Sequence, residues 1–175
     1  MRPAPPSPTS SRPSPLLRPI EGPDVDAVLA LNEANVELLA PMDEARLDQL
    51  RAWSLRADVV EVGGEFAGFV ITMGPGTAYD SANYRWFAQR YGTGFHYLDR
   101  IVLSERFRRC GLGSAVYDIV ETDAAARVGL LTLEVNADPP NPASLAFHAG
   151  RGYTEVGRLG APGKTVAMMA KHLTP

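Results

Sequence analysis

The clearest chemical signal in this sequence is a loop rich in arginine and glycine, residues 106–114, between a hydrophobic run and a segment with helical spacing. The first N–H groups of a helix lack partners inside it, and the helix dipole adds partial positive charge, so such a loop can hold a phosphate without a metal. Gly111 and Gly113 let the backbone approach closely, and Arg106, Arg108 and Arg109 add bidentate donors. The loop therefore predicts a phosphate-bearing ligand.

The spacing within this loop argues against two common nucleotide-binding motifs. No Gly-Lys-Ser/Thr ends it, as a Walker loop requires. Gly111-Leu112-Gly113 is followed by Val116 where a dinucleotide fingerprint has its third glycine. The predicted ligand is therefore of another phosphate-bearing class.

The pattern Arg-x-x-Gly-x-Gly from Arg108 to Gly113 resembles the pyrophosphate loop of the acetyl-CoA-dependent N-acetyltransferase superfamily, GNAT. About thirty residues on, LEVNADPPNPASLAFHAGRGY resembles that family's strand and helix ending in N-x-x-A/S-x-x-L/F-Y-x-x-x-G-F/Y. The two motifs have the family's order and separation and cover residues 98–156. The resemblance, to a bacterial-type small-molecule or uncharacterised branch, implies an α/β fold with a mixed, mostly antiparallel sheet, splayed central strands and flanking helices.

The resemblance also implies that acetyl-CoA is the co-substrate and that no metal is needed. In the family the strand before the loop hydrogen-bonds the pantetheine arm, and the loop N–H groups hold the pyrophosphate. Asn141 resembles an asparagine that contacts the pantetheine, although an N-cap before Pro142 explains it equally well. Cys110 is expected to offer only its backbone, because thiol catalysis needs an adjacent base. The implied cofactor-binding residues are Ile101, Val102, Leu103, Arg108, Arg109, Cys110, Gly111, Leu112, Gly113, Ser114 and Asn141.

Acetyl transfer to an amine requires the neutral amine, which costs about 4 to 5 kcal/mol at pH 7 for a lysine-like amine and about 1 kcal/mol for an α-amine. Glu134 is the predicted base, acting through water, because strand alternation places Thr132 and Glu134 opposite Leu131, Leu133 and Val135. A charge on a solvated sheet face, or one paired with arginine, explains Glu134 equally well. Asp99 is the second candidate, and an ion pair with Arg100 is its simpler interpretation.

His148 stands at the position where many members of the family have a tyrosine that protonates the CoA thiolate. Histidine can donate a proton too, but its reach is shorter. His148 is therefore predicted either as that acid or as a hydrogen-bonded helix residue beside the cofactor. No metal-ligand spacing links it to His96 or His172.

The acceptor end of the site carries the weakest signal. In the family the first helices and the connection before the cofactor strand form the acceptor walls. On that basis the aromatic residues of this connection form a wall of the acceptor site, or else they are core residues beneath a long loop. The predicted acceptor-binding residues are Asn35, Tyr84, Trp86 and Asp99.

Hydrophobic periodicity predicts the elements that must position these residues. Two helices are expected, from Pro23 to about Leu39 and over 43–55, followed by a hairpin of 57–62 and 66–73 around a diglycine turn. The aromatic-rich connection 74–94 is expected to carry a short helix. The core unit is a strand over 95–103, the loop, a helix to about residue 127 and a strand over 130–135. A short helix after residue 142 and two closing strands, 153–159 and 165–173, complete an α/β fold with a mixed sheet.

Composition limits the class of protein, its location and its domain organisation. The 175 residues include one cysteine and carry a formal charge of −3, so neither a disulfide framework nor a global attraction to nucleic acid or anionic membrane is expected. No apolar run is long enough to span a membrane, and the cytoplasm is the expected location. Residues 1–15, rich in proline and serine, are expected to form a disordered tail before a single domain over 16–175.

Together these observations predict an N-acetyltransferase that moves an acetyl group from acetyl-CoA to a primary amine of a small or amino-acid-like acceptor, by direct transfer in a ternary complex. A non-catalytic CoA-binding regulatory module is one alternative, suggested by histidine in place of tyrosine at position 148. A protein N-acetyltransferase is another. A homodimer is compatible with such a fold, although no interface run is evident.

Overall fold

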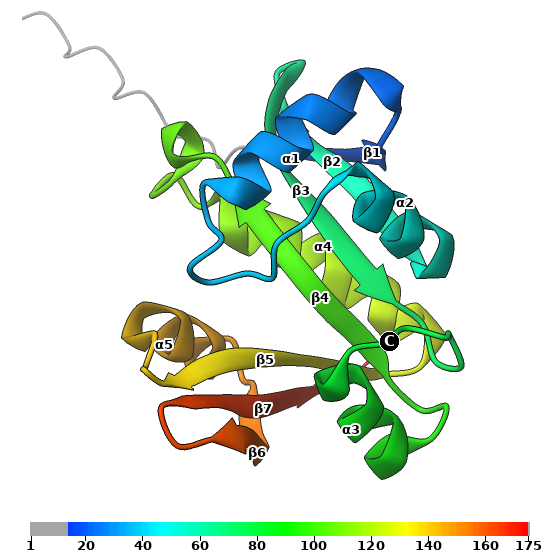
Figure 1. The fold of residues 1–175 in the computed structure, drawn as a ribbon, viewed down its shortest axis with the longest axis vertical. Helices are drawn as coiled ribbons and strands as arrows, with labels where there is room; N and C mark the ends of the chain where they lie inside the picture. The colour runs from blue at the N-terminus through cyan, green and yellow to red at the C-terminus, as the bar shows by residue number, and fades with distance from the viewer. Residues whose placement is uncertain (1–13, 175) are drawn as a thin grey trace, which may run out of the picture.

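In a computed structural model that describes residues 14–174, one seven-stranded sheet crosses the molecule with helices on both faces (Figure 1). The strand order is β1-β2-β3-β4-β5-β7-β6, and only β4 and β5 pair in parallel. This is the predicted mixed, mostly antiparallel α/β architecture. Of the predicted tail, residues 1–13 lie outside the described range. The strands are β1 (Leu16–Pro19), β2 (Arg56–Val62), β3 (Glu65–Met73), β4 (His96–Leu103), β5 (Leu130–Asp138), β6 (Thr154–Ala161) and β7 (Lys164–His172).

The helices follow the predicted order, with two differences. They are α1 (Val25–Glu33), α2 (Glu44–Trp53), α3 (Ala82–Tyr91), α4 (Leu112–Arg127) and α5 (Pro142–Gly150). The first helix ends at Glu33 rather than near Leu39, because the chain tightens into successive turns and the buried Asn32 amide donates to the carbonyl oxygen of Ala40 at 3.1 Å. The second difference concerns the short helix expected in the connection 74–94. This helix, α3, runs for ten residues between its Ser81 cap and Gly92.

The two central strands separate soon after they meet. Strands β4 and β5 pair only at His96 with Leu131 and at Tyr97 with Thr132. Beyond Tyr97, the edge of β4 that faces β5 has no strand partner among residues 14–174, while β5 continues to pair with β7 as far as Asp138. Figure 1 shows the wedge that results between β4 and β5. This is the splay that the family resemblance predicts.

A β-bulge lies on β4 at the start of the splay. Thr72 of β3 pairs with Leu98 and Ile71 pairs with Arg100, so Asp99 is the extra residue. Bulges are frequent beside active sites because they redirect side chains. Here the bulge places two successive side chains together, and Arg100 Nε donates to Asp99 Oδ2 at 2.7 Å.

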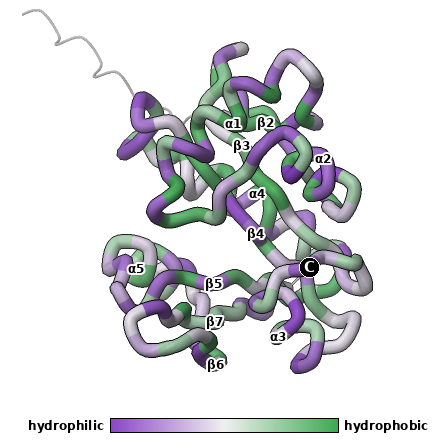
Figure 2. Tube along the Cα trace, in the orientation of Figure 1, coloured by the Kyte–Doolittle hydropathy of each residue, from purple (hydrophilic) through white to green (hydrophobic). Residues whose placement is uncertain are grey.

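The sheet separates two hydrophobic clusters. One packs α1, α2 and α3 against the sheet, including Val28, Leu47 and Phe87, and the other packs α4 against the opposite face through Val116 and Val120. Figure 2 shows the hydrophobic trace along β3 and the hydrophilic residues on outer parts of α2 and α3. None of the helices within residues 14–174 has the length and apolar character needed to cross a membrane.

Candidate active site and cofactor slot

The loop before α4 offers a set of unused backbone donors. Gly111 caps the helix with φ of +82°, and Arg109 also has a positive φ, +60°. Within residues 14–174, the N–H groups of Gly111, Leu112, Gly113 and Ser114 donate no hydrogen bond, and Ala115 is the first to do so, to Gly111 at 3.1 Å. Leu112 contributes only its backbone here, since its side chain lies in the core. Such a row of free N–H groups is the arrangement that binds a diphosphate.

Exposed charges surround this loop. Arg106 pairs with Glu65, and Arg108 Nη1 donates to Glu105 Oε1 at 3.1 Å. Arg108 Nη2 also lies 3.4 Å from Asn35 Oδ1, so Asn35, which was predicted to bind the acceptor, lies beside this loop. Surface pairs of this kind contribute little to stability, which leaves the Arg108 guanidinium available to an anion.

The remaining predicted cofactor residues lie on β4, in the loop before α4 and at the start of α5. Ile101, Val102 and Leu103 are the last three residues of β4, on the stretch whose β5-facing edge is unpaired. Asn141 caps α5, where its Oδ1 accepts from the Ser144 N–H at 3.1 Å, so the predicted N-cap role is confirmed. The Cys110 thiol is exposed and donates to the carbonyl oxygen of Phe107.

Glu134 lies on β5 two residues beyond the last pair with β4, and its half-buried carboxylate accepts from Tyr97 Oη at 2.7 Å. Leu131, Leu133 and Val135 pack on the opposite face with α4, which confirms the predicted alternation. Burial raises the pKa of Glu134 to about 7, and the negative charge of Asp99 adds to this. Hydrogen bonds from Tyr97 and Asn83 act in the opposite direction. A carboxyl group with this pKa can exchange a proton at neutral pH.

Asp99 is held by two neighbours. Its Oδ1 accepts from Tyr79 Oη and its Oδ2 from Arg100, and only 5% of its side chain is exposed. Arg100 in turn donates to Asn32 Oδ1 at 2.9 Å. The ion-pair interpretation of Asp99 is therefore confirmed, and the pair connects β4 to α1.

His148 is buried, and both of its ring nitrogens have partners. Nδ1 lies 2.7 Å from the carbonyl oxygen of Ser144, which can only accept, so Nδ1 carries the proton. Nε2 lies 2.6 Å from Tyr117 Oη and accepts from it. Burial lowers the pKa of His148, and the positive charge of Arg151 lowers it further. This geometry is that of the hydrogen-bonded helix residue, and in it neither nitrogen holds a proton free for a thiolate.

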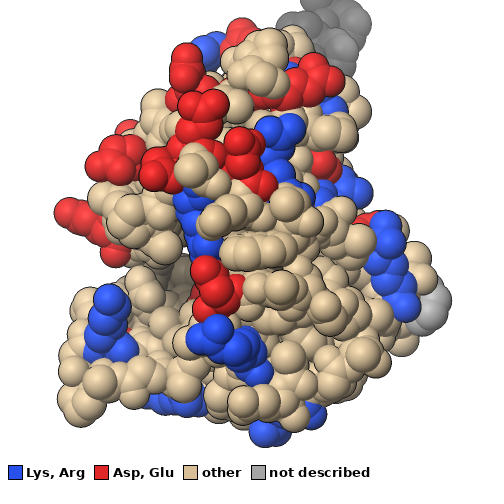
Figure 3. Space-filling view, turned by 45° about the vertical axis from the view of Figure 1, so that its right-hand side comes forward, with Lys and Arg blue, Asp and Glu red and all other residues tan. Residues whose placement is uncertain are grey.

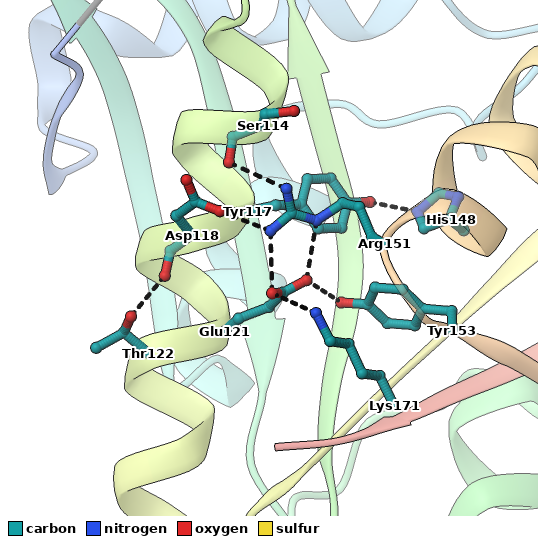
Figure 4. A network of polar contacts seen from close by, with 9 residues as sticks. All are labelled: Ser114, Tyr117, Asp118, Glu121, Thr122, His148, Arg151, Tyr153 and Lys171. Atoms are coloured by element: carbon teal, nitrogen blue, oxygen red, sulfur yellow. Dashed lines mark hydrogen bonds and ion pairs between the residues drawn. The ribbon is translucent and has the colours of Figure 1, made fainter. Parts of the chain in front are cut away.

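Tyr117 is a residue that the sequence interpretation missed. It lies one turn of α4 beyond Gly113, on the side that meets α5. This four-residue spacing from the glycine was the sequence feature that could have identified Tyr117. Arg151 lies over its ring at 5.3 Å and donates to Glu121 at 3.0 and 2.9 Å (Figure 4). Glu121 also accepts from Lys171 at 2.7 Å and from Tyr153 at 3.1 Å. This cluster fixes α5 and the closing strands against α4.

The aromatic residues predicted at the acceptor wall have different positions. Tyr84 is 3% exposed and donates to the carbonyl oxygen of Gly74 at 2.8 Å, so it is a core residue, which was the alternative to a place in the acceptor wall. Trp86 packs against β6, where a Cβ on Gly157 would lie 2.6 Å from its Cζ2 atom.

The splay itself is an open groove. Figure 3 shows a hollow between the part of the molecule at the level of α1 and α2, where Asp and Glu gather, and the part at the level of β5 to β7. Two shallow hollows lie elsewhere, one beside Glu121 and Lys171 and one between Trp53 and Gly76. The free N–H groups before α4 and the Glu134 carboxylate mark the candidate site, because these groups can bind an anion and exchange a proton. Within the described residues, no three potential ligands among His, Cys, Asp and Glu gather as a metal site.

Residues 27–153 match the acetyltransferase (GNAT) family. None of the curated proteins matches the sequence.

Solved structures share the fold at low sequence identity. Ard1 from Thermoplasma volcanium has 19% identity and a TM-score of 0.72, with 93% of this chain and 99% of that chain covered. The ribosomal-protein-S18-alanine N-acetyltransferase from Escherichia coli has 19% identity and a TM-score of 0.66, covering 92% and 95%. Spermidine N-acetyltransferase from Vibrio cholerae, solved with CoA and spermine, has 16% identity and a TM-score of 0.68, covering 91% and 95%.

These likenesses concern the fold, while the family match extends over most of the chain and includes both sequence motifs. The splayed strands, the loop with free N–H groups and the family match agree with one another. The chain belongs to the acetyltransferase (GNAT) family.

Proposed function

We propose that this protein transfers an acetyl group from acetyl-CoA to a primary amine of a small or amino-acid-like acceptor, by direct transfer in a ternary complex. The observation that supports this most strongly is the splay, which has a potential base at its narrow end and an anion-binding loop at its wide end. Glu134 is two residues past the last β4–β5 pair, and the four free N–H groups follow the other end of β4.

The residues that hold acetyl-CoA in this proposal lie along β4 and the loop. The unpaired edge of residues 101–103 offers backbone groups to the amides of a pantetheine arm, and the N–H groups from Gly111 to Ser114 receive the pyrophosphate. Arg108 adds positive charge, and Asn141 lies at the start of α5. Bound acetyl-CoA would supply the thioester. The amine would attack its carbonyl carbon, the C–S bond would break, and coenzyme A would leave as a thiolate that takes a proton from solvent.

Glu134 accepts the proton that the acceptor's ammonium group must lose. With a pKa of about 7, it takes a proton from an α-ammonium group at a cost of roughly 1 kcal/mol and from a lysine-like ammonium at roughly 4 to 5 kcal/mol. This difference favours an amino-acid-like acceptor over an alkylamine. The acidic side chains near α1 and α2 favour the approach of a cationic acceptor to this side of the groove.

The amino terminus of a protein or peptide is the second candidate acceptor. The position of Trp86 favours it, because packing against Gly157 leaves this ring unable to close a small pocket. Its α-amine meets the same proton-transfer requirement as a free amino acid.

An acceptor screen tests the proposal. Purified protein and acetyl-CoA are incubated with amino acids, polyamines and short peptides, free thiol is followed, and the acetylated product is identified by mass spectrometry. We expect α-amines to react, and Glu134→Gln to lower kcat by about 100-fold or more. Glu155→Gln, a carboxylate-to-amide change at an exposed site on β6, is the matched control and should leave the rate unchanged.

Two outcomes would contradict this account. Binding of acetyl-CoA without acetylation of any amine would instead support a CoA-binding module. Acetylation that proceeds equally well in Glu134→Gln would remove Glu134 from the mechanism.

A further inference from the structure

We propose that Tyr97 is the positioning residue for Glu134, and that the β3–β4 connection, residues 74–95, holds Tyr97 in place. The proposal rests on the proposed function, because it takes Glu134 as the base for the acceptor amine. It adds a tyrosine to which neither the sequence motifs nor the family match assigns a role, and it gives the connection a positioning role besides that of an acceptor wall.

The bond between Tyr97 and Glu134 joins the two halves of the sheet at the narrow end of the splay. Tyr97 is the last β4 residue paired with β5, and Glu134 lies two positions beyond its partner Thr132, on the same face. The two residues are 37 positions apart in the sequence, and their side chains meet at 2.7 Å. Tyr97 Oη is fully buried and makes no other hydrogen bond among the described residues, so the contact satisfies its phenol as well as orienting the carboxylate.

Aromatic rings from the connection surround Tyr97. The ring centroids of Tyr79, Tyr84 and Phe87 lie 6.3, 5.7 and 5.9 Å from that of Tyr97. Antiparallel neighbours such as β3 and β4 need only about two to five linking residues, whereas residues 74–95 include the whole of α3. The added length therefore supplies the packing that fixes the Tyr97 ring.

The connection is attached on both sides of the splay. Tyr79 donates to Asp99 on β4, and Asp80 pairs with Arg46 of α2 through contacts of 2.6 and 2.9 Å. On the other side, Trp86 rests directly on Gly157 of β6. Since only two residue pairs join β4 to β5, these attachments limit how far Tyr97 and Glu134 can move apart.

Few charged or titratable groups face Glu134. They are Tyr97, Asp99 and its partner Arg100 on β4, and Tyr79 on the connection, which also brings the Asn83 amide. On β7 the paired residue is the apolar Met168. The bond from Tyr97 holds the pKa of Glu134 down against burial and Asp99, so losing the hydroxyl must raise that pKa.

The test compares Tyr97→Phe with Tyr84→Phe. Both changes remove one phenol from the same aromatic cluster, but the Tyr84 hydroxyl donates to Gly74 rather than to Glu134. The Glu134 carboxyl carbon is titrated by carbon-13 NMR, with Glu134→Gln identifying its signal, and the pH profile of kcat/KM for the amine is measured alongside.

We expect Tyr97→Phe to raise two midpoints, that of the NMR titration of Glu134 and that of the pH profile of kcat/KM. It should also lower kcat/KM at pH 7 by about three- to tenfold, with recovery at higher pH. The KM for acetyl-CoA should not change. Tyr84→Phe should leave both midpoints where they are in the wild type. Trp86→Leu loosens the contact with β6 and keeps the Tyr97 phenol, so it should raise both midpoints by a smaller amount. This variant provides the test if Tyr97→Phe does not fold. Arg85→Ala on the exposed side of α3 is its control.

An unchanged Glu134 midpoint in Tyr97→Phe would overturn the proposal, as would an equal change in Tyr84→Phe or a loss of rate of the same size at every pH. The NMR titration does not depend on catalysis. If the wild-type protein acetylates no amine, the proposed function fails, while the titration still decides whether Tyr97 controls Glu134.

Discussion

Tyr117 on α4 and His148 on α5 share a buried hydrogen bond of 2.6 Å between Oη and Nε2. The other ring nitrogen of His148 is held by the carbonyl oxygen of Ser144. The imidazole is thereby fixed in one tautomer, and the bond joins the helix that begins at the anion-binding loop to the helix that Asn141 caps.

The first prediction concerns the energetic coupling of this pair. His148→Phe leaves the Tyr117 phenol buried without its acceptor, and we expect it to lower the free energy of unfolding by about 1 to 3 kcal/mol. In the double variant with Tyr117→Phe both polar groups are gone, so the loss should be smaller than the sum of the two single losses. Urea denaturation of the four proteins measures this coupling. Additive losses would show that the two side chains do not interact.

Two buried histidines predict how stability depends on acid. Burial lowers the pKa of His96 to about 4 and also lowers that of His148, so both are neutral in the folded protein while the unfolded chain gains their protons below about pH 6.5. Stability should therefore fall as the pH drops from about 6.5 towards 4. Glu134 acts in the opposite direction over about pH 4.5 to 7, because its folded pKa is raised.

His96→Leu isolates one part of this dependence. His96 Nε2 is buried without a partner within the described chain, so the change removes an unsatisfied atom. The fall in the free energy of unfolding below about pH 6.5 should become smaller by up to about 3 kcal/mol. Denaturation at a series of pH values measures it, with the exposed His172→Gln as the control. If the free energy of unfolding falls as steeply in acid as it does in the wild type, His96 does not cause this part of the pH dependence.

The cluster around Glu121 should be a major stabilising contact of α5. Burial raises the pKa of Glu121, but hydrogen bonds from Arg151 and Lys171 outweigh it and hold that pKa below its usual value. Arg151→Ala leaves this carboxylate, 12% exposed, with fewer donors, and we expect a loss of about 2 to 4 kcal/mol in thermal or urea unfolding. Arg158→Ala, which breaks an exposed pair with Glu155, should leave the free energy of unfolding nearly unchanged. Equal losses would mean that the cluster is no more important than a surface pair.

Local patterns predicted much of the fold and one end of the site. The diglycine turn, the Asn141 cap and the loop before α4 depend on residues near each other in the chain, and each forms as predicted. Alternation along β5 also placed Glu134 on the correct face, because β5 is regular at that point.

Contacts between distant segments account for the features that were not predicted. The bulge at Asp99 depends on the register with β3, which strand alternation cannot reveal. The tyrosine partners of Glu134 and His148 lie 37 and 31 positions away, on other elements. Tyr84 is aromatic in a loop-like segment, and only the packing of α3 on the sheet shows that it belongs to the core.

The central claim is that the free N–H groups at the start of α4 hold the diphosphate of coenzyme A. Nitrogen-15 NMR titration of the protein with CoA, and separately with pantetheine, tests it most directly. We predict that the amide resonances of Gly111, Leu112, Gly113 and Ser114 shift strongly with CoA and hardly at all with pantetheine, which has no diphosphate. Saturation with CoA that leaves these four resonances unmoved would contradict the account.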